Sequence, residues 1–515
     1  MSAYHIAMSK ILFVTSEIYP LIKTGGLADV SASLPRALQK LGAEVRIVMP
    51  AYHDALLKTT SRTSISRFNL EGNKVSIIES RLASSEVKIW LIDYPQYFER
   101  PGNPYLSQEG IQWTDNAHRF SFFAKAVVEI AMGRVGLGWT PNIVHCNDWQ
   151  SGLAPALLSF EIRPPATVFT IHNLAYQGLF GYSVFKQLNL PPQFWHYKAL
   201  EFHNQVSFIK GGLVYADRCN TVSPTYAQEI QSSEFGFGLE SLLTYRKDRL
   251  NGILNGIDTE TWNPKTDKYI PQNFNSTTLP TKVANKSALQ QELNLPRSTN
   301  DPLLASIGRL VPQKGIDLLF EALPQLVKMP LQIVFLGSGE KKYERSLSNW
   351  ARKYPKRICF RQGYDETLSH RIEAGADIFL MPSLFEPCGL NQMYSQRYGT
   401  VPIVRRVGGL ADTVIDTNKK TIASGKATGI IFELPTGNAL LHAVSQAVKL
   451  YQNKKYWEQI QLAGMQRDFS WRKSAKQYSK IYELALEDAV RKIRFKSKFI
   501  NAQTAAHTKT KSGYR

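Results

Sequence analysis

The sequence predicts an α/β protein with two domains, each built on a doubly wound parallel sheet, and two observations lead to this prediction. Short β-branched runs alternate with longer amphipathic stretches along most of the 515 residues, as they do in consecutive βαβ units. The pentapeptide Gly-Gly-Leu-Ala-Asp also occurs twice, at 25–29 and at 408–412, each time shortly after a strand-like run. We therefore expect two similar nucleotide-binding folds that face one site.

The first domain is predicted from strand-like runs in the N-terminal half. Strands are expected at 11–15, 44–49, 87–92, 143–145, 167–171 and 218–222, and a helix over 27–41 follows the first of them. Buried parallel strands read as short, almost continuously apolar runs of this kind. We assign residues 1–254 to this domain.

The second domain is predicted from a similar series after a turn-rich linker near 252–262. Its strands are expected at 303–307, 331–336, 358–362, 378–381 and 401–404. We assign residues 255–490 to this domain. The remaining residues, 491–515, hold eight Lys or Arg side chains and no acidic one, so we expect a frayed, solvated basic tail.

Composition and charge exclude several classes of protein. Hydrophobic residues make up 43% of the chain and charged residues 20%, and no apolar run approaches the roughly 18 residues that a membrane helix needs. The net charge of +20 is scattered apart from the tail, so we do not expect a nucleic-acid-binding protein. The four cysteines form no C-x-x-C pair, which argues against a zinc site or a disulfide framework. Together with an N-terminus too short for a signal peptide, this predicts a cytoplasmic protein.

Ligands of open parallel sheets bind beyond the carboxyl ends of the strands, and this rule selects a short set of candidate residues. They are Lys23, Gly25, Gly26, Asp148, His172 and Asn173 in the first domain, and Gly308, Arg309, Gly337, Gly339, Glu386, Gly408 and Gly409 in the second. A glycine pair at a helix start presents unpaired N–H groups and the positive end of a helix dipole to a phosphate. Lys23 stands beside the first pair and Arg405 and Arg406 beside the second. The expected ligand is therefore an anion, although each glycine turn taken singly is more simply explained by the fold.

The absence of several motifs limits the chemistry. The chain has no phosphate loop of the G-x-x-x-x-G-K-[ST] type, no complete G-x-G-x-x-G and no Asp-x-Asp. P-loop phosphoryl transfer, ordinary dinucleotide binding and a metal-held nucleotide diphosphate are therefore not indicated. The charge of a diphosphate must then be met by cations and helix ends. Arg309 and Lys314, five residues apart after a predicted strand, suit this role; a surface salt bridge is the alternative.

Three further side chains suit a sugar. A carboxylate at Glu386, in an apolar loop, can steady the positive charge that develops on a glycosyl unit or orient a hydroxyl group; a helix-capping or salt-bridged glutamate is the alternative. His172 can hydrogen-bond a hydroxyl group, although a lone histidine is more often structural. Trp149, next to Asp148, offers a ring for stacking, and packing in the core explains it equally well.

Taken together, six ordered motifs resemble one family over nearly the whole chain: the bacterial glycogen synthases and plant starch synthases, which are retaining glucosyltransferases of the two-domain GT-B type. The motifs are Lys-Thr-Gly-Gly-Leu-Ala-Asp-Val at 23–30, His-Asn-Leu-Ala-Tyr-Gln-Gly at 172–178, Asn-Gly-Ile-Asp at 255–258, Gln-Lys-Gly at 313–315, Glu-Pro-Cys-Gly-Leu at 386–390 and Gly-Gly-Leu-Ala-Asp-Thr-Val at 408–414. The resemblance implies two Rossmann-like domains that face an interdomain cleft. It also implies that a helix near 475–490 crosses back to the first domain.

The resemblance further implies the reaction, which is transfer of glucose from ADP-glucose to the non-reducing 4-hydroxyl of an α-1,4-glucan, with retention and without a metal or a cofactor. The catalytic residues that it implies are Glu386, His172, Arg309 and Lys314. The substrate-binding residues that it implies are Lys23, Gly25, Gly26, Asp29, Asp148, Asn173, Asn255, Cys388, Gly389, Gly408 and Gly409. The implied partners are ADP-glucose and a glycogen or α-1,4-glucan primer, with no nucleic acid and no membrane.

Three positions depart from patterns of this family and its relatives. The wider retaining GT-B group often has a second Glu where this chain has Tyr394, and the glycogen synthase branch shares this departure. Asn391 lies where that branch often has Thr, and Gln150 lies where it often has His. These positions concern donor or acceptor preference and not the reaction class. The alternatives are a relative that uses UDP-glucose or builds another α-glucoside, and a glucan-binding scaffold with little activity. The intact set of implied catalytic residues argues against the scaffold.

Overall fold

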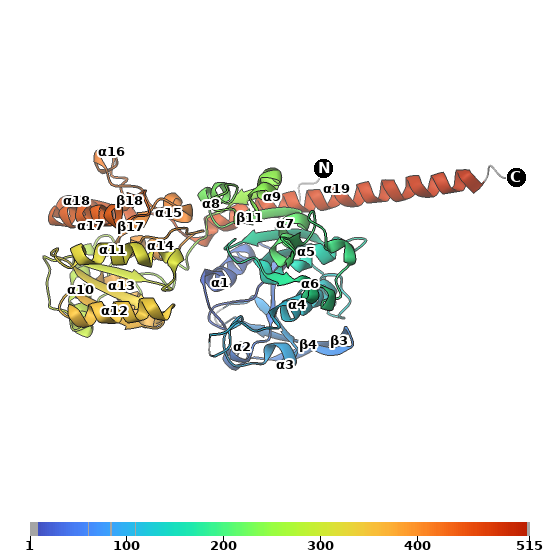
Figure 1. The fold of residues 1–515 in the computed structure, drawn as a ribbon, viewed down its shortest axis with the longest axis horizontal. Coiled ribbons are helices and arrows are strands. Elements are labelled where there is room, and N and C mark those ends of the chain that lie inside the picture. The colour runs from blue at the N-terminus through green and yellow to red at the C-terminus, as the bar shows by residue number, and fades with distance from the viewer. Residues whose placement is uncertain (1–8, 60, 83–84, 109, 512–515) are drawn as a thin grey trace. The chain divides into compact units, whose positions relative to one another are not determined.

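The computed structural model of the chain describes residues 9–59, 61–82, 85–108 and 110–511, with the backbone alone for 495–511, and the chain forms two compact units (Figure 1). Unit 1 contains the chain up to Thr221, Ile230–Ile253 and the chain from Trp471 onward. Unit 2 contains Val222–Glu229 and Leu254–Ser470. Each unit is an α/β fold with a largely parallel sheet, which confirms the predicted fold class.

The division of the chain differs from the predicted domains at two places, although the predicted boundary after residue 254 lies next to the crossing from Ile253 to Leu254. Residues 471–490 belong to unit 1, as the family resemblance implied for the returning helix, and Val222–Glu229 belong to unit 2. The frayed tail predicted for 491–515 is wrong as far as the backbone is described, because helix α19 runs over Trp471–Lys511. Residues 512–515, and the side chains from 495 on, lie outside the described part.

Unit 1 is built on a sheet that has nine strands within the described residues. Their order across the sheet is β12-β11-β7-β6-β1-β2-β5-β4-β3. The strands are β1 (Lys10–Val14), β2 (Glu44–Pro50), β3 (Thr63–Leu70), β4 (Asn73–Arg81), β5 (Lys88–Asp93), β6 (Ile143–Asn147), β7 (Ala166–Ile171), β11 (Arg218–Thr221) and β12 (Leu250–Gly252). All neighbouring pairs are parallel except β3–β4 and β4–β5. Each strand predicted for this half is present, and β3, β4 and β12 were not predicted.

The helices of unit 1 connect these strands. They are α1 (Gly26–Gln39), α2 (His53–Lys58), α3 (Pro95–Phe98), α4 (Asn116–Ala131), α5 (Leu153–Leu158), α6 (Tyr182–Gln187), α7 (Phe208–Tyr215), α9 (Glu240–Tyr245) and α19. A small second sheet pairs β10 (Gln205–Ser207) with β8 (Leu179–Gly181) and β9 (Glu201–Phe202). Helix α1 buries Leu27, Val30, Leu34 and Leu38, which form the apolar stripe of a helix that packs on a sheet.

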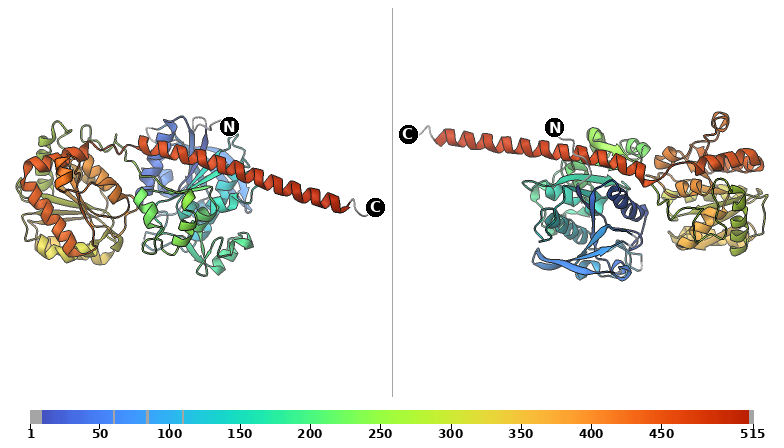
Figure 2. Two further views of the ribbon diagram at one scale, coloured as in Figure 1. Left: turned by 90° about the horizontal axis from the view of Figure 1, so that it is seen from above. Right: turned by 180° about the vertical axis from the view of Figure 1, so that it is seen from behind.

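A buried polar network anchors α19 in unit 1. His145 Nε2 donates to the hydroxyl of Thr170 at 2.6 Å, since that hydroxyl itself donates to Asn220 Oδ1 at 2.7 Å. The hydroxyl of Tyr482 then donates to His145 Nδ1 at 2.8 Å, and the amide of Asn220 donates to the hydroxyl of Tyr478 at 3.0 Å. Helix α19 also contacts α1 and β7, and its first part lies along unit 1 in both views of Figure 2. The buried side chains of this part, such as Tyr478 and Tyr482, therefore belong to the core of the unit.

The described residues of unit 2 form a parallel six-stranded sheet in the order β15-β14-β13-β16-β17-β18. The strands are β13 (Leu303–Ile307), β14 (Gln332–Gly337), β15 (Ile358–Gln362), β16 (Ile378–Met381), β17 (Val401–Arg405) and β18 (Ile430–Phe432). The first five were predicted to within one residue at either end. The chain doubles back between β15 and β16, which makes the sheet doubly wound.

Helices cover both faces of this sheet (Figures 1 and 2). The helices described in unit 2 are α8 (Pro224–Glu229), α10 (Lys282–Glu292), α11 (Ile316–Leu326), α12 (Lys341–Lys353), α13 (Glu366–Gly375), α14 (Asn391–Arg397), α15 (Gly408–Thr413), α16 (Lys419–Ala423), α17 (Gly437–Gln452) and α18 (Lys454–Met465). The core joins strand residues such as Ile333 and Ile403 to Leu323 of α11 and Val444 of α17. No helix in the described part of the chain combines the length and the apolar character that spanning a bilayer requires.

Candidate functional site

The first Gly-Gly loop, between β1 and α1 of unit 1, is held by a carboxylate of its own unit. Glu17 is buried and accepts hydrogen bonds from the backbone N–H groups of Thr24 at 2.5 Å and Gly25 at 3.3 Å. The hydroxyl groups of Thr24 and Tyr105 donate to the same carboxylate, both at 2.6 Å. The amides of Thr24 and Gly25 are therefore bonded to a carboxylate of the protein itself, and the approach of a phosphate to Gly25 and Gly26 stays a prediction.

The outer side of this loop is open. Lys23 is exposed, and its Nζ lies 2.9 Å from Oδ1 of Asp29. Gly26 is also exposed, and Gly25 is half-buried with an extended backbone. A Cβ added at Gly25 would meet no atom within 4 Å. The fold of unit 1 thus does not require glycine at position 25, whereas close approach of a ligand to the backbone would.

Asp148 holds the turn that carries His172 and Asn173. Its backbone has a positive φ of 55°, and its Oδ1 accepts hydrogen bonds from the N–H groups of His172 at 2.7 Å and Asn173 at 3.4 Å. Burial raises the pKa of this carboxyl to about 7, against the lowering effect of the two N–H groups. Asp148 therefore shapes the loop after β7, and its direct contact with a substrate stays a prediction.

The ring of His172 has a defined tautomer. Asn147 Nδ2 donates to the carbonyl of Val14 at 2.9 Å, so Asn147 Oδ1 is the acceptor for His172 Nε2, also at 2.9 Å. This network assigns the proton of the neutral ring to Nε2 and leaves a lone pair on Nδ1. Burial lowers the pKa of His172 to about 3, so the ring is neutral at neutral pH. Nδ1 can then accept a hydrogen bond from a sugar hydroxyl.

Trp149 packs inside unit 1. Its ring lies 5.0 Å from that of Phe120 and 6.0 Å from that of Phe180, between centroids. Gly178, with a φ of +61°, allows this packing, since a Cβ there would come within 2.4 Å of the Trp149 ring. Of the two interpretations of Trp149, the contacts favour core packing over a sugar platform.

In unit 2, two of the predicted catalytic residues form an ion pair. Nζ of Lys314 lies 2.5 Å from Oε2 of Glu386, and the hydroxyl of Ser383 donates to the same oxygen at 3.0 Å. Lys314 ends the short helix η5 (Pro312–Lys314) after β13, and Glu386 lies in the loop after β16. Gly315 lets the two segments meet, because its φ is +69° and a Cβ there would lie 2.0 Å from the carbonyl oxygen of Pro382. The strand-end rule thus predicted residues that the structure brings together.

Arg309 lies at the same edge of the sheet, directly after β13, and is exposed. Asn391, the first residue of α14, donates from Nδ2 to the carbonyl of Ile307 at 2.9 Å and so ties α14 to the end of β13. Gly337 and Gly339 serve close packing of the neighbouring loop, since added Cβ atoms would lie 2.0 and 2.2 Å from the carbonyl oxygens of Gly308 and Leu310. The predicted cation is therefore exposed at this edge, and these two glycines are explained by the fold.

The second Gly-Gly pair does not form an open anion site, which corrects the prediction for Gly408 and Gly409. Both residues are buried. The N–H of Gly408 donates to Oε1 of Glu229 at 2.9 Å, and the N–H of Gly409 donates to the carbonyl of Glu386 at 3.1 Å. Cβ atoms would lie 2.0 Å from the Glu386 carbonyl oxygen and 2.2 Å from that of Cys388, respectively. This pair lets α15 pack against the loop of Glu386.

The two arginines before this pair also differ from the prediction. The guanidinium of Arg405 donates to the carbonyls of Ser383 and Leu384, and that of Arg406 to Oε1 of Glu433 at 2.5 Å. Their charges are used within unit 2 and do not flank exposed amides.

The remaining predicted residues of unit 2 lie together. Asn255 is buried beside the sulfur of Cys388, and its Oδ1 has no hydrogen-bond partner among the described residues. Burial raises the pKa of the Cys388 thiol to about 12. Gly389 has a φ of +72°, and Gln392 donates to its carbonyl at 3.0 Å.

Sequence reasoning missed three residues of these sites. Glu17 and Ser383 follow β1 and β16 closely, so the strand-end rule could have found them. Tyr364 follows β15 and is 64% exposed, which places an aromatic ring at the same edge of the sheet as Arg309. None of the three belongs to the recurring pentapeptide.

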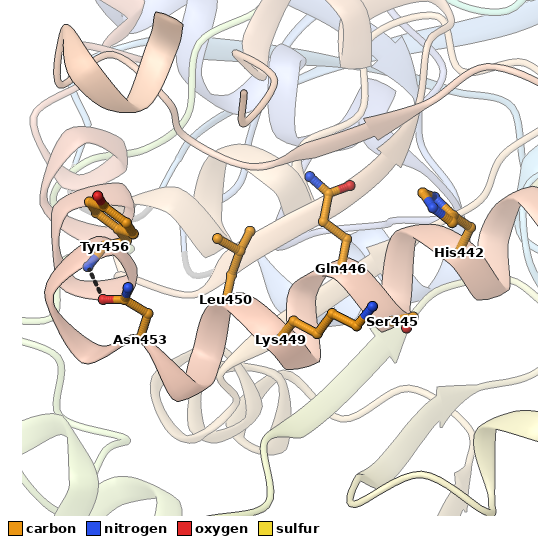
Figure 3. Close-up of a pocket in the computed structure, with 7 residues that line it drawn as sticks. All are labelled: His442, Ser445, Gln446, Lys449, Leu450, Asn453 and Tyr456. Carbon is orange, nitrogen blue, oxygen red and sulfur yellow. Dashed lines mark hydrogen bonds between the residues drawn. The ribbon is translucent and has the colours of Figure 1, made fainter. Parts of the chain in front are cut away.

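A hollow of about 400 Å³ lies elsewhere in unit 2, along α17 and the start of α18 (Figure 3). It is lined by His442, Ser445, Gln446, Lys449, Leu450, Asn453 and Tyr456. The side chain of Asn453 caps α18, where it accepts from the N–H of Tyr456 at 3.3 Å. No predicted site residue lines this hollow. Among the described residues, no three His, Cys, Asp or Glu side chains cluster as metal ligands would.

Comparison with known proteins gives matches over almost the whole chain. The family model of the starch synthase catalytic domain matches residues 10–245, and that of glycosyl transferases group 1 matches residues 290–461. Glycogen synthase 1 of Methylococcus capsulatus is 54% identical over 93% of this chain and 97% of its own. Glycogen synthase of Cellvibrio japonicus is 53% identical over 92% of this chain and 99% of its own.

A solved structure is similar as well. The catalytic domain of starch synthase IV from Arabidopsis thaliana, bound to ADP and acarbose, superposes with a TM-score of 0.85. It is 32% identical and covers 93% of this chain and 100% of its own.

Proposed function

The chain belongs to the glycogen synthase family and is a glycosyltransferase of glycogen synthesis, and on that premise we propose that it transfers glucose from ADP-glucose to the non-reducing end of an α-1,4-glucan with retention of configuration. The choice of an ADP-linked donor is supported by the similar starch synthase IV, which was solved with ADP bound. The glucan acceptor is supported by the glycogen synthases that match over 93% and 92% of the chain.

Unit 2 carries the groups suited to the donor. Arg309 is exposed at the carboxyl edge of the sheet, where it can neutralise a diphosphate, and the ring of Tyr364 at the same edge offers a face for a nucleobase. The ammonium of Lys314 and the carboxylate of Glu386 form a charge pair there. A glucosyl unit beside this pair meets a negative charge that can stabilise its oxocarbenium-like transition state. This ion pair, at the same edge of the sheet as the exposed Arg309, is the observation that carries the proposal.

Unit 1 carries the groups suited to hydroxyl recognition and to further charge. The lone pair of His172 Nδ1 accepts a hydrogen bond from a hydroxyl of the transferred glucose. Lys23 and the N–H of Gly26, at the open side of the first glycine loop, add positive charge for the diphosphate.

Retention fits a front-face transfer. The acceptor 4-hydroxyl oxygen forms a bond to the anomeric carbon on the side where the bond to the diphosphate breaks. The acceptor's proton passes to the departing diphosphate oxygen, so no protein nucleophile is required. The protein then acts by positioning and by charge stabilisation. The lack of a metal or cofactor requirement and the cytoplasmic location stay predictions.

The proposal is tested by incubating the purified chain with glycogen and labelled ADP-glucose, with UDP-glucose as the competing donor. We expect incorporation from ADP-glucose, weak competition by UDP-glucose, and a product that α-1,4-specific amylases digest completely. Binding of glycogen without incorporation would show a scaffold, and preferential incorporation from UDP-glucose would correct the donor. Incorporation that persists in a chelator would support the absence of a metal.

A further inference from the structure

We propose that Ser383 is a positioning residue for Glu386, because its hydroxyl and the ammonium of Lys314 together fix Oε2 and leave Oε1 as the oxygen that meets the glucosyl unit. This inference rests on the proposed function, which gives the Glu386 carboxylate its role at the sugar.

Two donors converge on one oxygen of the carboxylate. Ser383 Oγ lies 3.0 Å and Lys314 Nζ 2.5 Å from Glu386 Oε2. Within the described residues, Oε1 accepts no hydrogen bond. A carboxylate with both protein donors on one oxygen has its plane and its outer oxygen fixed before the substrate arrives, and such preorganisation keeps the reorganisation energy low during the reaction.

The Ser383 hydroxyl is itself placed rigidly. Ser383 is 1% exposed, and the Nε of Arg405, from the end of β17, donates to its carbonyl at 2.9 Å. The same guanidinium donates to the carbonyl of Leu384, and its Nη1 donates to that of Glu433 at 3.3 Å. One buried arginine therefore holds the backbone on which the Ser383 hydroxyl sits.

The other side of the loop is tied to the segment of Lys314. The N–H of Leu384 donates to the carbonyl of Gln313 at 2.8 Å, and the side-chain amide of Gln313 donates to the carbonyl of Phe385 at 3.2 Å. Both donors to Glu386 Oε2 thus sit on backbone segments that are bonded to each other. The hydroxyl of Ser383 donates to the Glu386 carboxylate, and the inference gives this hydroxyl no contact with the substrate. Its effect on the reaction is therefore exerted through Glu386.

The experiment is a double-mutant cycle on the full chain with four variants, Ser383→Ala, Ser383→Thr, Glu386→Gln and the double variant Ser383→Ala/Glu386→Gln. Loss of a hydrogen bond to a charged group predicts a fall of about tenfold in kcat for Ser383→Ala. We expect the KM for ADP-glucose to change less than twofold, because the hydroxyl does not bind the donor. Ser383→Thr keeps the hydroxyl and should recover most of kcat. In the Glu386→Gln background, Ser383→Ala should add little, because coupled residues are not additive.

Ser369→Ala is the matched control. Ser369 is also buried in unit 2, but its hydroxyl donates to the backbone carbonyl of Asp365 at 2.7 Å. We expect it to lower the melting temperature and to leave kcat unchanged. Calorimetric melting and ADP titration of each variant show that it is folded and binds nucleotide.

Three outcomes overturn the inference. An unchanged kcat in Ser383→Ala, with a normal wild type, refutes the role of Ser383 and leaves the proposed function standing. A tenfold loss that persists in the Glu386→Gln background shows a purely structural effect. A wild type that binds ADP and does not transfer glucose refutes the proposed function, and this inference falls with it.

Discussion

The backbone N–H of Gly408 donates a hydrogen bond to Oε1 of Glu229 at 2.9 Å. In return, Oδ2 and Oδ1 of Asp412 accept from the N–H of Thr225 at 3.0 Å and from its hydroxyl at 2.7 Å. A carboxylate of α8 thus accepts a hydrogen bond from the first turn of α15, and a carboxylate of α15 accepts hydrogen bonds from the first turn of α8. Because Asp412 belongs to the second pentapeptide, that copy of the repeat serves to join α8 to unit 2, whereas the first copy borders an exposed loop.

We predict that Glu229→Ala lowers the free energy of unfolding by about 1–2 kcal/mol, because a helix N-terminus loses its carboxylate acceptor. Urea unfolding followed by circular dichroism measures the change. Glu234→Ala, which removes an exposed glutamate five residues further along the chain, in unit 1, should stay within about 0.5 kcal/mol of the wild type. Unchanged stability of Glu229→Ala, together with tighter ADP binding, would show that the Gly408 amide serves a ligand.

Substitution of glycine by alanine should have opposite effects in the two glycine pairs, with a loss of activity in the first pair and a loss of stability in the second. Gly25→Ala meets no atom within 4 Å and keeps an allowed backbone, so we expect a wild-type melting temperature and a fall of at least about tenfold in kcat/KM if phosphate approaches this backbone. Gly409→Ala would bring a Cβ to 2.2 Å from the carbonyl oxygen of Cys388 and should destabilise the fold by several degrees. Normal kinetics in Gly25→Ala would remove the first loop from the donor site.

Most of the strands could be predicted because they are buried on both faces of the sheet, so that their sequences are short continuous apolar runs. The hairpin of β3 and β4 escaped prediction because neither strand is a continuous apolar run. Most residues of β3 are exposed or half-buried, with polar side chains such as Ser64 and Arg67, and in β4 the buried Val75 and Ile77 are separated by Ser76. The place of α8 in unit 2 was not predicted, and the return of α19 to unit 1 was expected from the family resemblance alone and not from the residue pattern. Both depend on non-local bonds, such as that of Tyr482 to His145, which leave no local pattern.

The candidate site could be predicted in part. The strand-end rule placed Lys314 and Glu386 at one edge, and the structure pairs them. It could not tell which N–H groups are already occupied, because Glu17 and Glu229 reach the glycine loops only through the folded chain. The same pentapeptide therefore forms an exposed loop at Gly25 and Gly26 and a buried loop at Gly408 and Gly409.

We predict that Lys23→Ala and Arg309→Ala each reduce kcat/KM for ADP-glucose by about 10²–10³, because removal of a group that stabilises transition-state charge costs ~3–4 kcal/mol. Stability should change little, since both residues are exposed and a surface ion pair such as Lys23–Asp29 contributes under about 1 kcal/mol. Steady-state kinetics and melting curves separate the two effects. Lys419→Ala, at an exposed lysine of α16, is the control and should behave as wild type. Near-normal turnover of either test variant would exclude that residue from the charge-stabilising role.

The carboxyl of Asp148 gives unit 1 a distinct pH dependence. Its pKa is raised by burial from 3.8 to about 7, so between these pH values the folded state holds a proton that the unfolded state has lost. The stabilisation from this group is therefore complete below about pH 4 and is lost as the pH rises to about 7. Asn does not titrate and its Oδ1 can accept the same two N–H bonds. The stability of Asp148→Asn relative to wild type should then rise by a few kcal/mol across this range, at about 1.4 kcal/mol per pKa unit. Urea unfolding of both proteins at pH 5, 6, 7 and 8 measures this difference, and a difference independent of pH would show that Asp148 stays ionised in the folded state.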